Sequence, residues 1–176
     1  REPINNPMFY GLSKLIGEKI VSEIKDDLFT VNLRLPGVLG KNVQNSWLFM
    51  AMVKLKKHET LLIHSPNSLF NNVIHTSELI RFIKYVVKSN FSFESGLAVN
   101  FSASKPIVFG KVIEFIRERF ESNSVILTEE GGPSFYVATK VLSDKFSYYA
   151  RDTFEQVKLA IDEIKCMDVE GKTQWP

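Results

Sequence analysis

Apolar residues follow two different spacings along this chain, and their alternation predicts an α/β protein. Residues 10–24 carry apolar side chains three and four positions apart with charged residues between them, which predicts an amphipathic helix packed on a larger body. Residues 29–38 are mostly apolar and β-favouring, which predicts one buried strand. We therefore expect the chain to begin with a helix followed by a strand.

The same change of spacing recurs to the end of the chain. We expect a helix over 45–56 and short strands over 61–64, 72–74 and around 125–127. Three further helices have predicted apolar sides: Leu79, Ile80, Ile83, Val86 and Val87 in a helix over 77–87; Phe109, Val112, Ile113 and Ile116 in a helix with Pro106 in its first turn; and Phe154, Val157, Ile161 and Ile164 in a helix from Asp152.

Two capping pairs compete at the start of the last helix. Asp152 with Glu155 and Thr153 with Gln156 both have the spacing of a capping box. Residues 168–176 beyond this helix show no periodicity, so we expect the tail to fray.

Composition is that of an ordinary globular domain. The chain has 176 residues, of which 44% are hydrophobic and 24% charged, so residues 1–176 can form a single compact unit. A net charge of +2, with basic residues spread among acidic ones, argues against nucleic-acid binding. No apolar run approaches the ~18 residues of a membrane span.

Cysteine and histidine usage excludes two kinds of site. Cys166 is the only cysteine, so an intrachain disulfide and a multi-cysteine metal site are both impossible, and a reducing cytoplasm is the simple interpretation. His58, His64 and His75 do not have metal-ligand spacing, so we expect no metal.

A tyrosine and a lysine one helical turn apart are the strongest chemical feature. Residues i and i+4 share a helix face, so the Lys14 ammonium can approach the Tyr10 hydroxyl. A fixed cation stabilises a phenolate, and Tyr10 could then exchange a proton with a substrate hydroxyl or carbonyl. A second Tyr-x-x-x-Lys, from Tyr136 to Lys140, begins in a β-favouring run, and we interpret it as a chance copy.

The first copy also resembles a known active-site helix. Residues 10–14 read Tyr-Gly-Leu-Ser-Lys and residues 34–40 read Arg-Leu-Pro-Gly-Val-Leu-Gly. This order and separation resemble the NAD-dependent epimerase/dehydratase group of the extended short-chain dehydrogenase/reductase superfamily. Residues 72–79, Asn-Val-Ile-His-Thr-Ser-Glu-Leu, and 98–101, Ala-Val-Asn-Phe, are similar to later junctions of that family. The likeness covers nearly the whole chain.

The resemblance implies a fold, a cofactor and a set of roles. The fold would be the C-terminal part of a Rossmann-type sheet with a small α/β substrate-binding lobe. Tyr10 would be the acid/base, Lys14 would bind the nicotinamide ribose of NAD or NADP, and Pro36, Gly37 and Val38 would face the nicotinamide. The small-molecule substrate would be a sugar, most simply a nucleotide sugar, and Asn71 and His75 would line its cleft.

Three departures separate this chain from the family pattern. No glycine-rich dinucleotide fingerprint follows a strand, and in the family that motif lies upstream of the tyrosine. Asn71 stands where members often place a phosphate-binding arginine, and no later arginine is evident near 131–134. Gly37 stands where many members carry a substrate-binding asparagine.

The leading interpretation is therefore one portion of an enzyme. We expect an NAD(P)-dependent epimerase, dehydratase or reductase of sugar-nucleotide or cell-surface polysaccharide metabolism, in which these residues belong to a longer polypeptide and are inactive alone. The resemblance implies a homodimer. The alternative is a non-catalytic cofactor- or partner-binding protein that keeps the same fold, and a third interpretation is an unrelated α/β domain with a chance Tyr/Lys pair.

Overall fold

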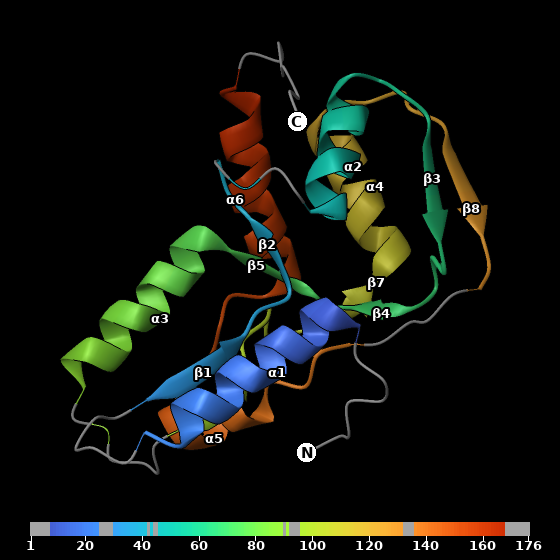
Figure 1. Cartoon of the computed structure of the whole chain (residues 1–176). Coiled ribbons are helices and arrows are strands. Elements are labelled where there is room, and N and C mark those ends of the chain that lie inside the picture. Colours follow the sequence, from blue (N-terminus) through green and yellow to red (C-terminus); the bar gives the residue numbers. More distant parts are fainter. Residues whose placement is uncertain are drawn as a thin grey trace.

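In the computed structural model, helices pack on strand pairs, most of which are parallel (Figure 1). This confirms the predicted α/β class. Among the described residues, no helix combines the length and apolar character needed to cross a membrane. The predicted fraying of 168–176 concerns residues outside the described ones. The structure describes residues 8–24, 30–41, 43, 46–89, 91, 96–131 and 136–167.

One part of the molecule, here called the sheet layer, is built on strands β1 (Val31–Arg34) and β6 (Leu97–Asn100). The two strands are parallel, with Val31 opposite Leu97 and Arg34 opposite Asn100. Strand residues alternate between faces, so Leu33 and Val99 share the face that packs with α3 (Thr76–Lys88) and α5 (Lys140–Phe146). Helix α1 (Phe9–Ser22) lies on the opposite face and runs against the direction of β1 (Figure 1).

The predicted strand over 29–38 is divided in two, so that expectation was wrong. Strand β1 ends at Arg34, and β2 (Gly37–Leu39) follows after Leu35 and Pro36. Proline has no N–H to donate to a ladder, and the chain bends there. Strand β2 then pairs in parallel with β5 (Val73–His75), a different partner from that of β1.

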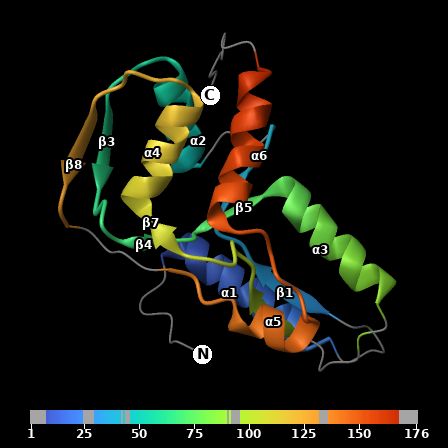
Figure 2. The same ribbon diagram turned by 180° about the vertical axis from the view of Figure 1, so that it is seen from behind.

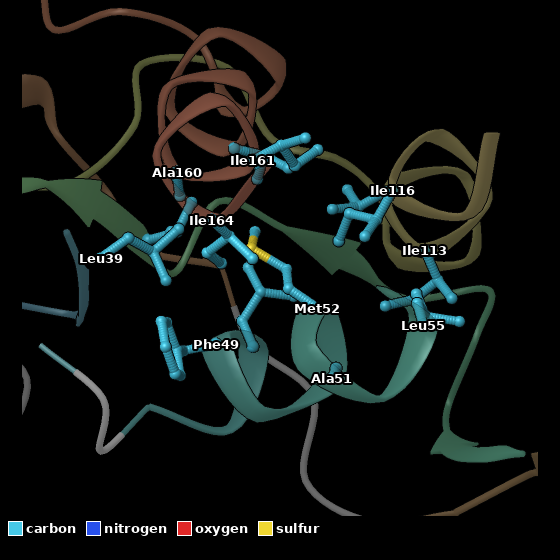
Figure 3. Packing of buried hydrophobic residues seen from close by; sticks show 14 of the residues in the cluster. Leu39, Phe49, Ala51, Met52, Leu55, Ile113, Ile116, Ala160, Ile161 and Ile164 are labelled. Carbon is cyan, nitrogen blue, oxygen red and sulfur yellow. The ribbon is translucent and has the colours of Figure 1, made fainter. Parts of the chain in front are cut away.

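The second part, here called the lobe, has its core between three helices. Figure 3 shows side chains of α2 (Trp47–Lys56), α4 (Phe109–Arg119) and α6 (Thr153–Lys165) meeting in one apolar cluster. Figure 2 shows, from behind, the parallel pair β3 (Leu61–His64) and β8 (Ile126–Glu129) at the outer side of α4. The short antiparallel pair β4 (Leu69–Phe70) and β7 (Ile107–Val108) lies at the base of α4.

Two of the predicted helix faces are confirmed here. Phe109, Val112, Ile113 and Ile116 of α4 are buried, as are Val157, Ile161 and Ile164 of α6. Phe154 is half-buried, with its ring centroid 4.8 Å from that of Phe115. The Asp152–Glu155 pair forms the capping box of α6, and Thr153 is instead the first helical residue. Pro106 precedes β7 and lies outside the first turn of α4, which corrects that prediction.

The predicted apolar side of α3 is confirmed only in part, since Leu79 and Val86 are half-buried and pack against the apolar cluster of the sheet layer. The buried residues of this helix are Glu78 and Phe82, whereas Ile80, Ile83 and Val87 are exposed. Phe82 packs against the rings of Phe101, Phe146 and Tyr148, with centroids 4.7, 5.3 and 4.9 Å away. Phe82 therefore lies at the centre of the buried side, and Ile80, Ile83 and Val87 turn outward.

Helix α1 forms where it is predicted but is not packed as predicted. None of its described residues is buried, and Phe9, Ile16 and Ile20 are among its exposed apolar side chains. Its contact with the sheet layer must therefore depend on something other than apolar burial.

Candidate functional site

Helix α1 places Tyr10 and Lys14 on one face near its N-terminal end. The Lys14 Nζ atom lies over the Tyr10 ring, 5.0 Å from the ring centroid. The side chain of Tyr10 is 75% exposed, so its hydroxyl is open to a molecule that approaches α1. The pair therefore offers one hydroxyl and one ammonium side by side at an accessible position.

The second Tyr-x-x-x-Lys does not form such a pair. Residues 136–139 have no regular structure, and α5 begins only at Lys140. Because Tyr136 lies outside a helix, its spacing to Lys140 does not give the two side chains a common helix face.

Pro36, Gly37 and Val38 form the bend at which β1 gives way to β2. A Cβ atom on Gly37 would lie 3.3 Å from the backbone oxygen of Asn72, so a larger residue would press on the segment that precedes β5. Gly40, which closes this motif, has φ of 155°, and a Cβ there would lie within 2.5 Å of Thr76 Oγ1. The glycines therefore let this bend lie against the segment around β5.

An ion pair that the sequence analysis missed joins α1 to β1. Arg34 donates from Nε to Glu18 Oε1 at 2.7 Å and from Nη2 to Glu18 Oε2 at 2.6 Å. The hydrogen bond to the carboxylate raises the pKa of Arg34 above its ordinary value, so the guanidinium is charged. Glu18 and Arg34 lie 16 positions apart on different elements, so no local spacing in the sequence indicated the pair.

Asn71 lies just before β5 and is buried. Its Nδ2 donates to the carbonyls of Ala103 and Val137, both at 2.9 Å, and its Oδ1 accepts from the Val137 N–H at 2.7 Å. Both amide protons are thus used in holding two distant segments together. A substrate contact at Asn71 would have to use the remaining lone pair of Oδ1.

His75 lies at the end of β5 and is also buried. Its Nδ1 accepts from the Ser77 N–H at 3.2 Å and lies 2.8 Å from Ser77 Oγ, so the ring caps the start of α3. Its Nε2 faces Glu163 Oε2 at 3.3 Å, a contact of poor hydrogen-bond geometry. The backbone N–H of His75 donates to Gln156 Oε1 at 2.9 Å.

A buried carboxylate near these residues was not identified from the sequence. Glu78 is 0% exposed and accepts hydrogen bonds from Arg81, from Tyr148 at 2.8 Å and from Arg151 at 2.6 Å. Burial, followed by the hydrogen bond to Glu78, raises the pKa of Tyr148 well above its ordinary value. This Glu78 cluster connects the start of α3 to the segment that leads into α6.

A cavity of about 220 Å³ lies apart from the predicted site residues. It is lined mainly by hydroxyl side chains from the segment after β6, the start of α5 and residues 148–150, including Ser102, Thr139 and Ser143. None of the predicted site residues lines it. No cluster of potential metal ligands is present within the described ranges.

The comparisons with known proteins point to one group of structures. No family model matches the sequence, and no curated protein matches it either. UDP-N-acetylglucosamine 4-epimerase from Bacillus cereus matches with a TM-score of 0.70 at 18% identity, covering 99% of this chain and 60% of that one. UDP-glucuronic acid 4-epimerase from Bacillus cereus, in complex with UDP-glucuronic acid and NAD, matches with a TM-score of 0.70 at 14% identity, covering 89% of this chain and 52% of that one.

A dehydratase has the same fold. dTDP-glucose 4,6-dehydratase from Bacillus anthracis, in complex with NAD, matches with a TM-score of 0.69 at 14% identity, covering 93% of this chain and 54% of that one. The chain thus spans between half and three fifths of the length of these three structures. The likenesses confirm the predicted fold: the chain has a mixed α/β structure that matches the C-terminal part of Rossmann-like epimerase/dehydratase structures.

Proposed function

We propose that this chain provides the catalytic helix and the substrate lobe of an NAD(P)-dependent enzyme that epimerises, dehydrates or reduces a sugar, most simply a nucleotide sugar. The observation that carries the proposal is the Tyr10–Lys14 pair, exposed on the helix that lies along β1. The matched structures are named as sugar-nucleotide epimerases and a dehydratase, which supports the same class of reaction here.

The donor set on α1 fits the sugar end of a nicotinamide cofactor. The Lys14 ammonium can donate hydrogen bonds to ribose hydroxyls, the Tyr10 hydroxyl lies on the same helix face, and Pro36, Gly37 and Val38 form the proposed nicotinamide-facing bend. When bound, NAD or NADP supplies the hydride acceptor or donor. Gly37 keeps this bend narrow, because a Cβ atom would meet the backbone of Asn72.

The proposed proton transfer uses Tyr10. As the phenolate, its oxygen accepts the proton of a sugar hydroxyl while the carbon that bears it is oxidised, and the resulting phenol returns that proton when the carbonyl is reduced. The Lys14 ammonium stabilises the negative charge on the phenolate oxygen during this transfer. A rotation of the flexible Lys14 side chain from above the ring would bring Nζ to the oxygen.

Asn71 and His75 are proposed to shape the substrate lobe. Both amide protons of Asn71 are donated to the carbonyls of residues 103 and 137. We therefore propose that Asn71 stabilises the backbone around the substrate site and does not bind a phosphate. We further propose a cytoplasmic protein, in accord with its single cysteine, and a homodimer that covers apolar residues of α1 such as Ile16 and Ile20.

The alternative is a non-catalytic protein that binds a cofactor or a partner with the same fold. Asn71 favours it, because a neutral and already hydrogen-bonded amide stands where related enzymes use a cationic phosphate ligand. Such a protein would bind cofactor without turning over a sugar nucleotide.

The test uses the protein produced from its natural gene. NAD and NADP binding is measured by titration, and turnover is measured with a panel of UDP- and dTDP-sugars. Tyr10→Phe is expected to lower turnover by about 100- to 10,000-fold with little change in cofactor affinity. Tyr136→Phe is the matched control, because it removes the hydroxyl of the second Tyr-x-x-x-Lys.

The outcomes separate the two functions. Full activity in Tyr10→Phe would contradict the proposed role of this tyrosine. Cofactor binding without turnover of any sugar nucleotide by the unmodified protein would support the non-catalytic alternative.

A further inference from the structure

Helix α1 rests on the sheet layer without a tightly packed interface. None of its described residues is buried, and a cavity of about 60 Å³ separates part of the helix from β1 and β6. Leu15 and Ser22 line this cavity from the helix, and Asn32 and Ala98 line it from the strands. Asn32 Nδ2 is buried there without a hydrogen-bond partner among the described residues. Apolar packing therefore does not fix the position of α1 along the strand.

A two-point contact occurs in the C-terminal half of the helix instead. The first point is the bidentate pair of Glu18 and Arg34, whose two parallel hydrogen bonds of 2.7 and 2.6 Å fix both distance and orientation. The second point is Gly96, where a Cβ atom would lie 2.5 Å from the Ser22 Cα. The helix backbone approaches the sheet layer closely only because residue 96 is a glycine.

The N-terminal half of α1, which carries Tyr10, extends beyond both points. Tyr10 precedes Glu18 by eight residues, which is about 12 Å along a helix. A tilt of about 10° around Glu18 would therefore move Tyr10 by about 2 Å. A misplacement of about 1 Å can lower a reaction rate by about 100-fold, so a small error at Glu18 is enlarged at Tyr10.

We infer that Glu18 and Arg34 are positioning residues that orient the Tyr10–Lys14 face of α1 toward the reacting atoms. This inference rests on the proposed function for its catalytic consequence. The two hydrogen bonds of the ion pair join Glu18 to Arg34, and Tyr10 lies two helical turns before Glu18. We expect its effect on turnover to pass through the orientation of the helix, because the pair fixes α1 to β1.

The variants Arg34→Lys and Glu18→Gln test the inference in the protein produced from its natural gene. Lysine keeps the charge but lacks the planar fork, and glutamine keeps the shape but lacks the charge. We expect either variant to lower kcat by about 10- to 100-fold, with KM and the NAD dissociation constant changed by less than about threefold. A loss of folded protein would also lower the apparent kcat at an unchanged KM, so kcat is expressed per NAD-binding site counted in the same titration.

Glu23→Gln is the matched control. Glu23 pairs with Lys19 on the same helix, and both side chains are largely exposed, so its loss removes an ion pair that does not reach the sheet layer. The charge-reversed double variant Glu18→Arg with Arg34→Glu is expected to recover at least about a tenth of wild-type kcat, because the pair can form again in the opposite sense.

Amide hydrogen exchange across residues 10–22 provides a readout that does not require turnover. Exchange is expected to be faster in Arg34→Lys and Glu18→Gln and unchanged in Glu23→Gln. If Tyr10→Phe is inactive while Arg34→Lys keeps the wild-type kcat, the inference is overturned and the proposed function stands. If the unmodified protein turns over no sugar nucleotide, the proposed function fails, and unchanged exchange in both pair variants would then overturn the inference separately.

Discussion

The raised pKa of Tyr148 predicts a specific loss of stability at alkaline pH. The phenol is buried and donates to Glu78 at 2.8 Å, and both effects favour the neutral form in the folded protein. In the unfolded chain a tyrosine titrates near pH ~10. Folded Tyr148 therefore keeps its proton at pH values where the unfolded chain has lost it.

The sign of the pH dependence follows from this difference. A group whose folded pKa is raised contributes its full stabilisation below the unfolded pKa and loses it as pH rises toward the folded pKa. Above pH ~10 the folded state holds one more proton than the unfolded state, so the free energy of unfolding falls by up to about 1.4 kcal/mol per pH unit. Between pH 9 and 11 the loss from Tyr148 amounts to about 1.4 kcal/mol, or roughly 3–6 °C in Tm for a chain of this size.

Urea denaturation at pH 9 and pH 11 measures this loss directly. Tyr148→Phe lowers stability at both values because it removes a hydrogen bond to Glu78, but the decrease between the two pH values should be smaller than in the wild type by about 1.4 kcal/mol. Tyr149→Phe is the matched control, since it removes a hydroxyl from a neighbouring side chain that is 72% exposed. An equal alkaline decrease in Tyr148→Phe and the wild type would refute the reasoning.

Two other substitutions test contacts that the structure makes specific. Glu78→Gln should lower the free energy of unfolding by about 2–4 kcal/mol in urea denaturation, because a buried charge with two arginine partners is lost, whereas Glu114→Gln, in an exposed pair with Arg117, should change it by less than about 0.5 kcal/mol. Ser147→Gly should raise the free energy of unfolding by about 0.5–1 kcal/mol, since Ser147 ends α5 in the left-handed region with φ of 48°; a lower thermal midpoint would contradict this.

Local features of the fold could be predicted from the sequence. The capping box of α6 depends on residues three positions apart, and the buried side of α4 depends on spacings within three turns. The division of the strand over 29–38 could have been predicted too, because Pro36 was visible and cannot join a ladder. The buried side of α3 could not, since Glu78 is buried only because Arg151, 73 positions away, and Tyr148 meet it there.

The candidate site also combines features that local spacing predicts with features that depend on distant residues. The common face of Tyr10 and Lys14 follows from a four-residue spacing, so the sequence alone predicts it. The burial of Asn71 and His75 does not follow from their neighbours, because their partners Val137 and Gln156 lie 66 and 81 positions away. The Glu18–Arg34 pair does not follow from local spacing either, because the two residues lie 16 positions apart on α1 and β1.

The junction between the sheet layer and the lobe explains why buried polar residues gather around β5. Val73 belongs to the apolar cluster of the lobe and its neighbour Ile74 to that of the sheet layer, so one short strand serves both. The Asn71 side chain donates to the Ala103 carbonyl, and the Gln156 side chain accepts from the backbone N–H of His75. Water could replace these side chains as hydrogen-bond partners only by entering one of the two apolar clusters. Substitutions here would therefore change how the lobe faces the sheet layer even though neither amide carries a chemical step. The position of the lobe relative to the sheet layer thus depends in part on these buried hydrogen bonds around β5.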